Sequence, residues 1–143
     1  MNQLAPMDFE QPQEEIEKII KTHFTEEVFL GGPGAIARMI VQHLLLDPES
    51  NKYRLLCTDS SRKHFKYVDA KTGEVQIDHR FQRFYDLLKT PSERANFLAF
   101  YLSLEKNDFK NDKHFSDVRD RNSNFIKSRD LLSDRIISEI TKT

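Results

Sequence analysis

The feature that most constrains the fold of this chain is an apolar segment, residues 35–46, bounded on both sides by helix-breaking residues. It follows the cluster Gly31-Gly32-Pro33-Gly34 and ends before Asp47-Pro48. Proline is tolerated in the first turn of a helix, whereas the residue before a proline avoids the helical region. Apolar side chains cover more than half of the helical cylinder, which is typical of a helix buried on most sides. We therefore expect a central core helix over residues 33–46.

The pattern that follows is typical of short strands separated by turns. The apolar or alternating runs are Tyr53–Cys57, His64–Val68 and Val75–Ile77. Strands this short need three members and a helix against their apolar face. Apolar residues spaced by three and four predict further helices near residues 13–24, 79–89, 91–105 and 115–141. The sequence thus predicts an α+β fold, in which a small antiparallel three-stranded meander packs on a mainly helical body.

A chain of 143 residues is long enough for one domain. Residues 1–12, mostly polar with two prolines, are expected to form a flexible arm. Residues 13–113 are expected to form the α+β core domain, and residues 114–143 a C-terminal amphipathic helical segment. The capping box Thr90-Pro91-Ser92-Glu93 predicts that a new helix begins there. The predicted core consists of Ile36, Ile40, Leu44, Leu55, Phe65, Phe84, Leu88, Leu98 and Tyr101.

The sequence carries no sign of a membrane segment or an oxidising compartment. No run approaches the ~18 consecutive apolar residues of a membrane-spanning helix. The first residues lack the basic and apolar regions of a secretory signal, and Cys57 is the only cysteine. We therefore expect a protein without a membrane partner in an intracellular, reducing compartment.

The sequence contains no strong catalytic or ligand motif. The glycine cluster at 31–34 could present backbone N–H groups to an anion, but it lacks the Lys-Ser/Thr of a phosphate-binding loop, so a sharp turn explains it better. Cys57 lies in an apolar run, as core cysteines do, and the five histidines lack metal-ligand spacing. Asp59, Asp69 and Asp78 each end an expected strand; turn formation is the favoured explanation, with Mg²⁺ binding as the alternative. We expect no catalytic, cofactor or metal site, and hence no enzymatic activity.

Charge is distributed unevenly along the chain, whose net charge is −1. Residues 1–50 carry a net charge of −6, whereas residues 51–100 carry +4 and residues 101–143 carry +1. Hydroxyl, Arg and Lys side chains contact phosphate oxygens, and a β-hairpin can lie along a groove of a nucleic acid. Weak, non-specific binding is expected, because phosphate contacts carry no sequence information. The predicted nucleic-acid-binding residues are Arg54, Ser60, Ser61, Arg62, Lys63 and Lys66. A solvated hairpin tip without a ligand explains the same pattern.

One segment of the chain resembles part of poorly characterised proteins from bacteriophages and large DNA viruses. The shared pattern is an apolar helix, a polar link, a strand, a basic turn and a hairpin, over about 40 residues. The residues that carry it are His43-Leu44-Leu45-Leu46, Asn51, Arg54-Leu55-Leu56-Cys57-Thr58-Asp59, Ser61-Arg62-Lys63, Phe65-Lys66-Tyr67, Asp69 and Gly73-Glu74. The resemblance implies a viral or mobile-element origin, a small non-enzymatic module, and a location in the host cytoplasm or the virion.

These observations lead to two expected functions. The first is a non-enzymatic viral or phage-type binding module that contacts nucleic-acid phosphates through the basic β-hairpin. The alternative is a protein-interaction or assembly component, either structural or binding a host factor. In that case the C-terminal helix is expected to bind a protein partner or a further copy of the chain.

Overall fold

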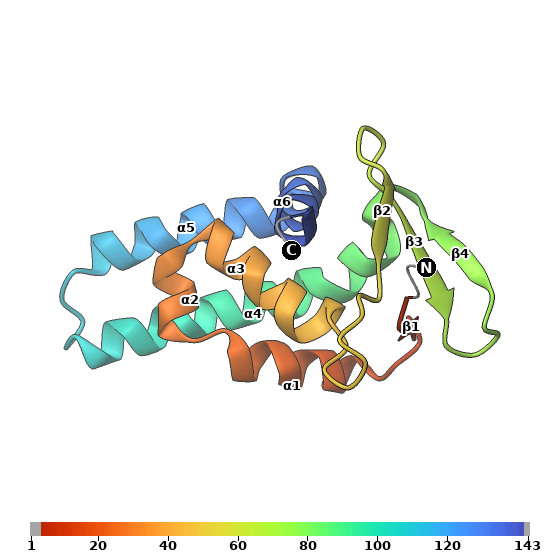
Figure 1. Ribbon diagram of the computed structural model, residues 1–143. Coiled ribbons are helices and arrows are strands. Elements are labelled where there is room, and N and C mark those ends of the chain that lie inside the picture. Colours follow the sequence, from red (N-terminus) through yellow and green to blue (C-terminus); the bar gives the residue numbers. More distant parts are fainter. Residues whose placement is uncertain (1–3, 142–143) are drawn as a thin grey trace.

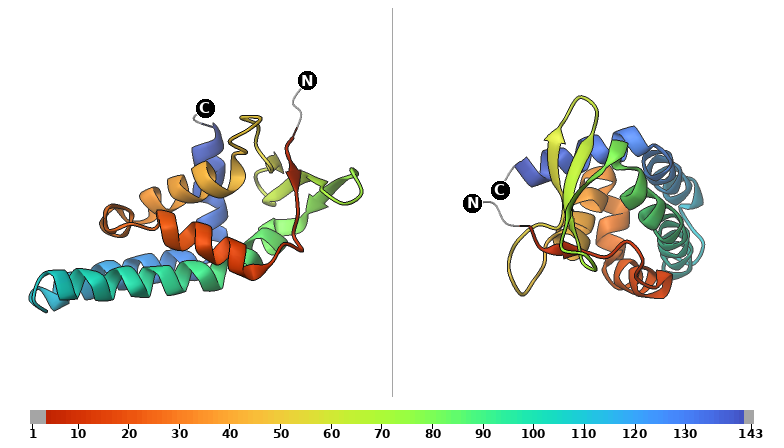
Figure 2. Two further views of the ribbon diagram at one scale, coloured as in Figure 1. Left: turned by 90° about the horizontal axis from the view of Figure 1, so that it is seen from below. Right: turned by 90° about the vertical axis from the view of Figure 1, so that its right-hand side faces the viewer.

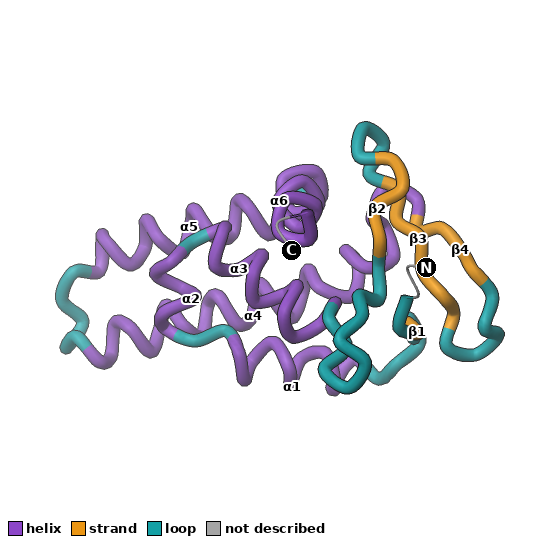
Figure 3. Tube along the Cα trace, viewed as in Figure 1, coloured by secondary structure: helices purple, strands orange, loops and turns teal. Residues whose placement is uncertain are grey.

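The computed structural model describes residues 4–141 and places a mainly helical body beside a small sheet (Figure 1). The helices in this range are α1 (Gln13–His23), α2 (Glu26–Gly31), α3 (Pro33–Ile40), α4 (Gln82–Lys106), α5 (Asp112–Lys127) and α6 (Arg129–Thr141). The strands are β1 (Pro6–Met7), β2 (Leu56–Asp59), β3 (His64–Asp69) and β4 (Val75–Asp78), gathered at one end of the molecule (Figure 3). The predicted α+β class is confirmed.

The sheet is four-stranded and mixed, so the prediction of a three-stranded antiparallel meander was wrong in this respect. β2 and β4 do pair antiparallel with the central strand β3, as a meander requires. A further strand, β1, runs parallel to β3, with Pro6 opposite Val68. Turn signals between neighbouring strands could not reveal this pairing, because β1 is about 60 residues away from β3 in the sequence.

The N-terminal segment supplies this additional strand. Residues 1–12 were expected to form a flexible arm; residues 1–3 lie outside the described residues, and from Leu4 onward the chain lies on the body instead. Ala5 and Met7 are buried, and the Phe9 ring packs edge-on against the Tyr67 ring with centroids 4.8 Å apart. The apolar residues interspersed in this polar segment therefore anchor it to the sheet and the core.

The expected core helix is confirmed over α3 and the π-helical turn Val41–Leu45 that extends it. Ile36 and Ile40 are fully buried. Gly32 starts this helix with a φ of +81°, and a Cβ at this position would come within 2.8 Å of the Arg121 guanidinium. The glycine cluster therefore acts as the sharp turn that the sequence favoured.

Pro91 does not divide the long helix α4, in contrast to the prediction that a new helix begins at Thr90–Glu93. The structure has one helix of 25 residues with Pro91 inside it. Proline removes one N–H from the helical hydrogen-bond ladder. The turns on both sides are nonetheless buried in the helical body, at Leu88 and Ala95. Tertiary packing therefore overrides the local start signal.

The C-terminal segment forms two helices that pack on the body. The chain turns at Ser128, which has an extended conformation, and α6 then lies against α3. The apolar side chains of the segment are largely buried, including Phe125, Leu132 and Ile136. Within residues 114–141, Leu131 is the only large apolar side chain that is exposed. The apolar side chains of this segment thus pack on the rest of the chain, and a partner bound by the C-terminal helix stays a prediction.

Two stacked histidines make the stability of the fold depend on pH. The His23 and His43 rings, from α1 and the π-helical turn, stack with centroids 3.5 Å apart. Burial, and then the neighbouring His23, lower the pKa of His43 below its ordinary value of 6.5. The folded state then binds fewer protons than the unfolded state, so the free energy of unfolding falls as the pH drops below 6.5.

We expect His43→Phe to keep the ring stack and to remove this part of the pH dependence. Urea titrations at pH 5 and pH 8 would measure it, with the mutant losing less stability between the two values than the wild type. An unchanged difference between the two pH values would contradict the assignment to His43.

Candidate protein-binding surface

The structure divides the predicted nucleic-acid-binding residues into three places. Arg54 is held by the fold, because its guanidinium donates a 2.7 Å hydrogen bond to the Pro6 carbonyl and pairs with Asp47 at 3.4 Å. Lys63 is also engaged, since its ammonium lies 3.4 Å from the Asp134 carboxylate and its side chain is 20% exposed. These two cations are therefore committed to tying the sheet to the body.

The remaining predicted residues lie at the hairpin tip and on the open sheet face. Ser60, Ser61 and Arg62 form the tip, where the Arg62 side chain is 76% exposed. Lys66 lies on β3 beside Leu56 and Ile77, its direct neighbours on β2 and β4. Because directly opposed residues share a face, Lys66 lies on the face of the sheet opposite to the buried Phe65 and Tyr67. The structure thus leaves a small basic surface, not the six-residue site that the sequence predicted.

The strand-end aspartates organise the backbone. Asp59 accepts hydrogen bonds from the Ser61 hydroxyl at 2.8 Å and the Arg62 N–H at 3.2 Å, and the Ser61 bond lowers the pKa of Asp59. The buried Asp78 carboxylate accepts the N–H groups of Arg83 and Phe84 at the start of α4. Burial raises the pKa of Asp78, against those two hydrogen bonds. Turn formation is confirmed for Asp59, while Asp78 caps a helix.

The described residues show no arrangement typical of an active site. Residues 4–141 contain no group of three or more His, Cys, Asp or Glu side chains placed to hold a metal ion. Burial raises the pKa of the half-buried Cys57 thiol, which disfavours the nucleophilic thiolate. A cavity of about 830 Å³ between α5 and α6 has carboxylates, but Asp117 pairs with Lys113 and Asp120 with Arg119. These groups form surface ion pairs and do not converge on one point.

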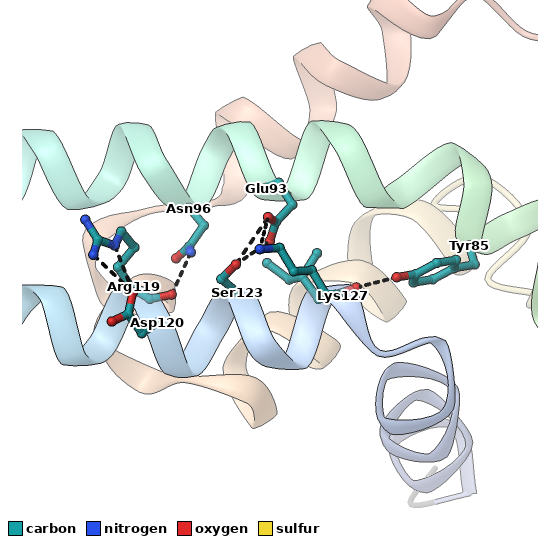
Figure 4. A network of polar contacts seen from close by, with 8 residues as sticks. Tyr85, Glu93, Asn96, Arg119, Asp120, Ser123 and Lys127 are labelled. Atoms are coloured by element: carbon teal, nitrogen blue, oxygen red, sulfur yellow. Dashed lines mark hydrogen bonds and ion pairs between the residues drawn. The ribbon is translucent and has the colours of Figure 1, made fainter.

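The helical hairpin formed by α4 and α5 extends beyond the rest of the body (Figure 2, left). Its two helices are joined by polar contacts along their shared seam (Figure 4). The Glu93 carboxylate accepts a 3.1 Å hydrogen bond from the Ser123 hydroxyl, and the Asn96 amide donates at 3.0 Å to the Arg119 carbonyl. Asn122 is fully buried and donates to both Asn96 and the Phe29 carbonyl. These directional contacts fix the register of the hairpin, and with it the direction in which the outer face of α4 points.

The outer face of α4 carries a set of exposed apolar side chains, which we term the apolar stripe. It consists of Phe97 (60% exposed), Leu98 (39%), Tyr101 (47%) and Leu102 (54%). The sequence had assigned Leu98 and Tyr101 to the core, and this was wrong. Ala95, Ala99 and Ser103 of α4 are buried instead, on the side where α1 and α5 pack.

Apolar residues occur all round α4, so periodicity could not select its buried side. Phe84, Leu88, Ala95, Ala99 and Phe100 are buried, while the apolar stripe lies on the remaining face. A helix that is apolar on all sides is expected to be buried all round. The excess of large side chains on α4 was the one signal in the sequence that could have indicated a further contact surface.

Phe109 extends the apolar stripe at the tip of the helical hairpin. It is 56% exposed, and its ring lies edge-on to the Tyr101 ring with centroids 6.3 Å apart. Its φ is +58°, in the left-handed region that is unfavourable for bulky residues. Phe81 has a positive φ as well but is fully buried, whereas the exposed Phe109 ring contributes little to the stability of the isolated fold.

Because of this strain, we expect Phe109→Asn to raise the free energy of unfolding by about 0.5–1 kcal/mol, since asparagine tolerates the left-handed region. Urea unfolding of the two proteins would measure the difference. Phe109→Ala is the control, because it removes the ring and keeps the strain. A loss of more than about 1 kcal/mol in the asparagine mutant would show that the ring supports the fold.

Comparisons with known proteins give no indication of function, so the proposal below is based on the chemistry of the surface. No described helix is long and apolar enough to cross a membrane. No protein family, curated protein or solved structure matches this chain.

Proposed function

We propose that this protein is a non-enzymatic protein-binding module, an interaction or assembly component, whose binding surface is the apolar stripe on α4. The observation that carries the proposal is the adjacency of Phe97, Leu98, Tyr101 and Leu102 on one helix face, all of them substantially exposed. Apolar residues scattered singly on a surface are ordinary, whereas adjacent large ones mark interaction sites. A viral or phage-type origin stays a prediction, and the proposal does not depend on it.

The position and rigidity of the stripe support this function. Tyrosine and phenylalanine are enriched in the centres of protein interfaces, where they bury large areas at a low cost in conformational entropy. A shallow depression of about 400 Å³ lies along Arg94, Phe97 and Tyr101 and can receive a partner's side chains. The polar seam between α4 and α5 keeps this face in place before any partner binds. A preorganised surface loses less entropy on association.

The proposal is tested by a photoreactive phenylalanine analogue placed at Phe97 in the full chain, with the same analogue at Leu131 as the control. Leu131 is equally apolar and is 55% exposed on α6, outside the stripe. Illumination in expressing cells is expected to give adducts of defined mass from position 97 and none from position 131. The proposal fails if position 97 gives no adduct, or if both positions give the same spread of products.

Nucleic-acid contact is a second candidate function, and the exposed Arg62 with the nearby Lys66 is the observation that favours it. Arg54 and Lys63 are less exposed and pair with Asp47 and Asp134, whereas Arg62 lies 3.7 Å from Asp59 but is 76% exposed, so we propose two phosphate contacts at most from these cationic side chains. Each phosphate contact contributes about 0.9 to the slope of log K against log salt.

Arg62→Glu combined with Lys66→Glu is therefore expected to abolish the weak binding and its salt dependence. Fluorescence anisotropy with labelled duplex and single strands at two salt concentrations would measure both. Lys113→Glu, on α5, is the control for charge alone. Equal affinity of the double mutant and the wild type would remove this second candidate.

A further inference from the structure

We propose that the partner of the apolar stripe is a second copy of this chain, bound through two α4 helices packed antiparallel about a two-fold axis between residues 99 and 100. This inference rests on the proposed function and specifies its partner. Four observations support it: the spacing of the stripe, its charges, its flanks and the position of the hairpin tip.

The spacing on α4 is that of a helix-pairing seam. Arg94, Leu98, Tyr101 and Glu105 follow one another at intervals of four, three and four residues. On a helix of 3.6 residues per turn these positions lie within about 60° of arc, in the middle of the stripe. Alternation of three and four is the repeat by which two helices pack side by side. The seam spans 12 residues and is apolar in the centre and charged at both ends.

The charges at the two ends make the seam complementary to itself only in the antiparallel direction. A two-fold axis between residues 99 and 100 brings Leu98 level with Tyr101 of the other copy. The same axis brings Arg94 level with Glu105 of the other copy. A parallel pair would instead align like charges, which is destabilising. Arg94 pairs with Glu17 of its own chain at 2.6 Å but is 70% exposed, and Glu105 is exposed, so a second chain can reach both side chains.

The flanks of the seam are apolar as well. Phe97 and Leu102 lie on opposite sides of the central row. The two-fold axis places each of them beside the same residue of the other copy. A two-fold symmetric interface requires a surface that is complementary to itself, whereas a surface that binds an unrelated partner has no such requirement. The self-matching order of charge, apolar centre and opposite charge is therefore the reason for choosing a second copy.

The tip of the helical hairpin adds a further contact in this arrangement. Phe109 of one copy reaches the level of residue 90 of the other. A depression of about 220 Å³ lies at this level between α1 and α4, lined by Glu17, Lys21, Pro91, Arg94, Ala95 and Leu98. The strained, exposed Phe109 ring is thus placed beside a depression on the other copy. This contact lengthens the interface beyond the four side chains of the stripe.

Charge reversal in the full chain, measured by sedimentation equilibrium, tests the pairing. Arg94→Glu and Glu105→Arg are each expected to weaken the dimer at least ~10-fold, because each places like charges at both ends of the seam. An equimolar mixture of the two mutants is expected to recover wild-type dimerisation, since every end pair is then opposite in charge. The double mutant carrying both changes is expected to recover it as well. Arg135→Glu on α6 makes the same change in net charge as Arg94→Glu and is expected to have no effect.

The outcomes separate this inference from the proposed function. A wild-type chain that stays monomeric at all concentrations, or a mixture that fails to recover dimers, overturns the self-pairing. If position 97 gives adducts with other proteins and none with a second copy of this chain, the self-pairing is also overturned, whereas the proposed binding surface is upheld. Arg94 pairs with Glu17 at 2.6 Å in the wild type, and Arg94→Glu breaks this pair. If the mutant lost its dimer only because it unfolds, the mixture would not recover dimers, because the pair with Glu17 stays broken there.

Discussion

Asn122→Asp is expected to destabilise the protein by about 3–5 kcal/mol at neutral pH, a large share of the stability of a domain of this size. The Asn122 side chain is fully buried and its amide donates to the Phe29 carbonyl at 3.0 Å and to the Asn96 side chain at 3.1 Å. An aspartate at this position has only carboxylate oxygens, which cannot donate hydrogen bonds to the Phe29 carbonyl or to the Asn96 side-chain oxygen. It would also bring a buried negative charge without a partner. Both effects oppose folding.

The pH dependence of this mutant identifies the cause. Burial raises the pKa of an aspartate, so the folded mutant would bind a proton more readily than the unfolded mutant. Its stability is therefore expected to recover as the pH falls toward 4 and to decrease as the pH rises. Asn124→Asp is the matched control on the exposed side of the same helix. Thermal and urea unfolding would measure both mutants, and similar losses in the two would contradict a specific role for Asn122.

Leu98→Asp is expected to weaken self-association by at least ~100-fold and to lower the stability of the fold by a smaller amount. Leu98 lies at the centre of the proposed seam, level with Tyr101 of the other copy, and the two-fold axis doubles the effect of each substitution. The side chain is 39% exposed in the single chain and borders α1, so the substitution also removes part of its packing on the body.

Sedimentation equilibrium gives the affinity of this mutant, and a circular-dichroism melt gives its stability. Leu131→Asp serves as the control, because Leu131 is 55% exposed and lies on α6 away from the stripe. Equal association of both mutants and the wild type would exclude the stripe as the contact surface. A large loss of melting temperature in Leu98→Asp would show instead that Leu98 supports the fold.

The parts of the fold set by local patterns could be predicted from the sequence. The core helix was predictable because Gly32 and Pro48 bound an apolar segment, and Ile36 and Ile40 are indeed fully buried. The strands β2, β3 and β4 were predictable within a few residues from their turns. The parallel strand β1 and the uninterrupted helix α4 were not, because both depend on packing between segments distant in the sequence.

The candidate site was less predictable, because surface chemistry depends on which neighbours the fold supplies. Lys63 is of a residue type that contacts phosphate, but it pairs instead with Asp134, which is 71 residues further along the chain. Leu98 and Tyr101 are of residue types common in cores, but α4 packs on the core through another side, which includes Ala95 and Ala99. Asn122 interrupts an apolar pattern in the sequence, and the structure shows that it joins α2, α4 and α5.

A distance between two spin labels tests the central claim most directly. Asp86, an exposed residue near the start of α4, is replaced by cysteine and labelled in a Cys57→Ser background. In an antiparallel pair about an axis between residues 99 and 100, the two labels are separated by roughly 40 Å, at 1.5 Å per residue. A double electron–electron resonance peak near this distance is the predicted result. A distance of roughly 20 Å, as in a parallel pair, or the absence of any dipolar signal, would contradict the account.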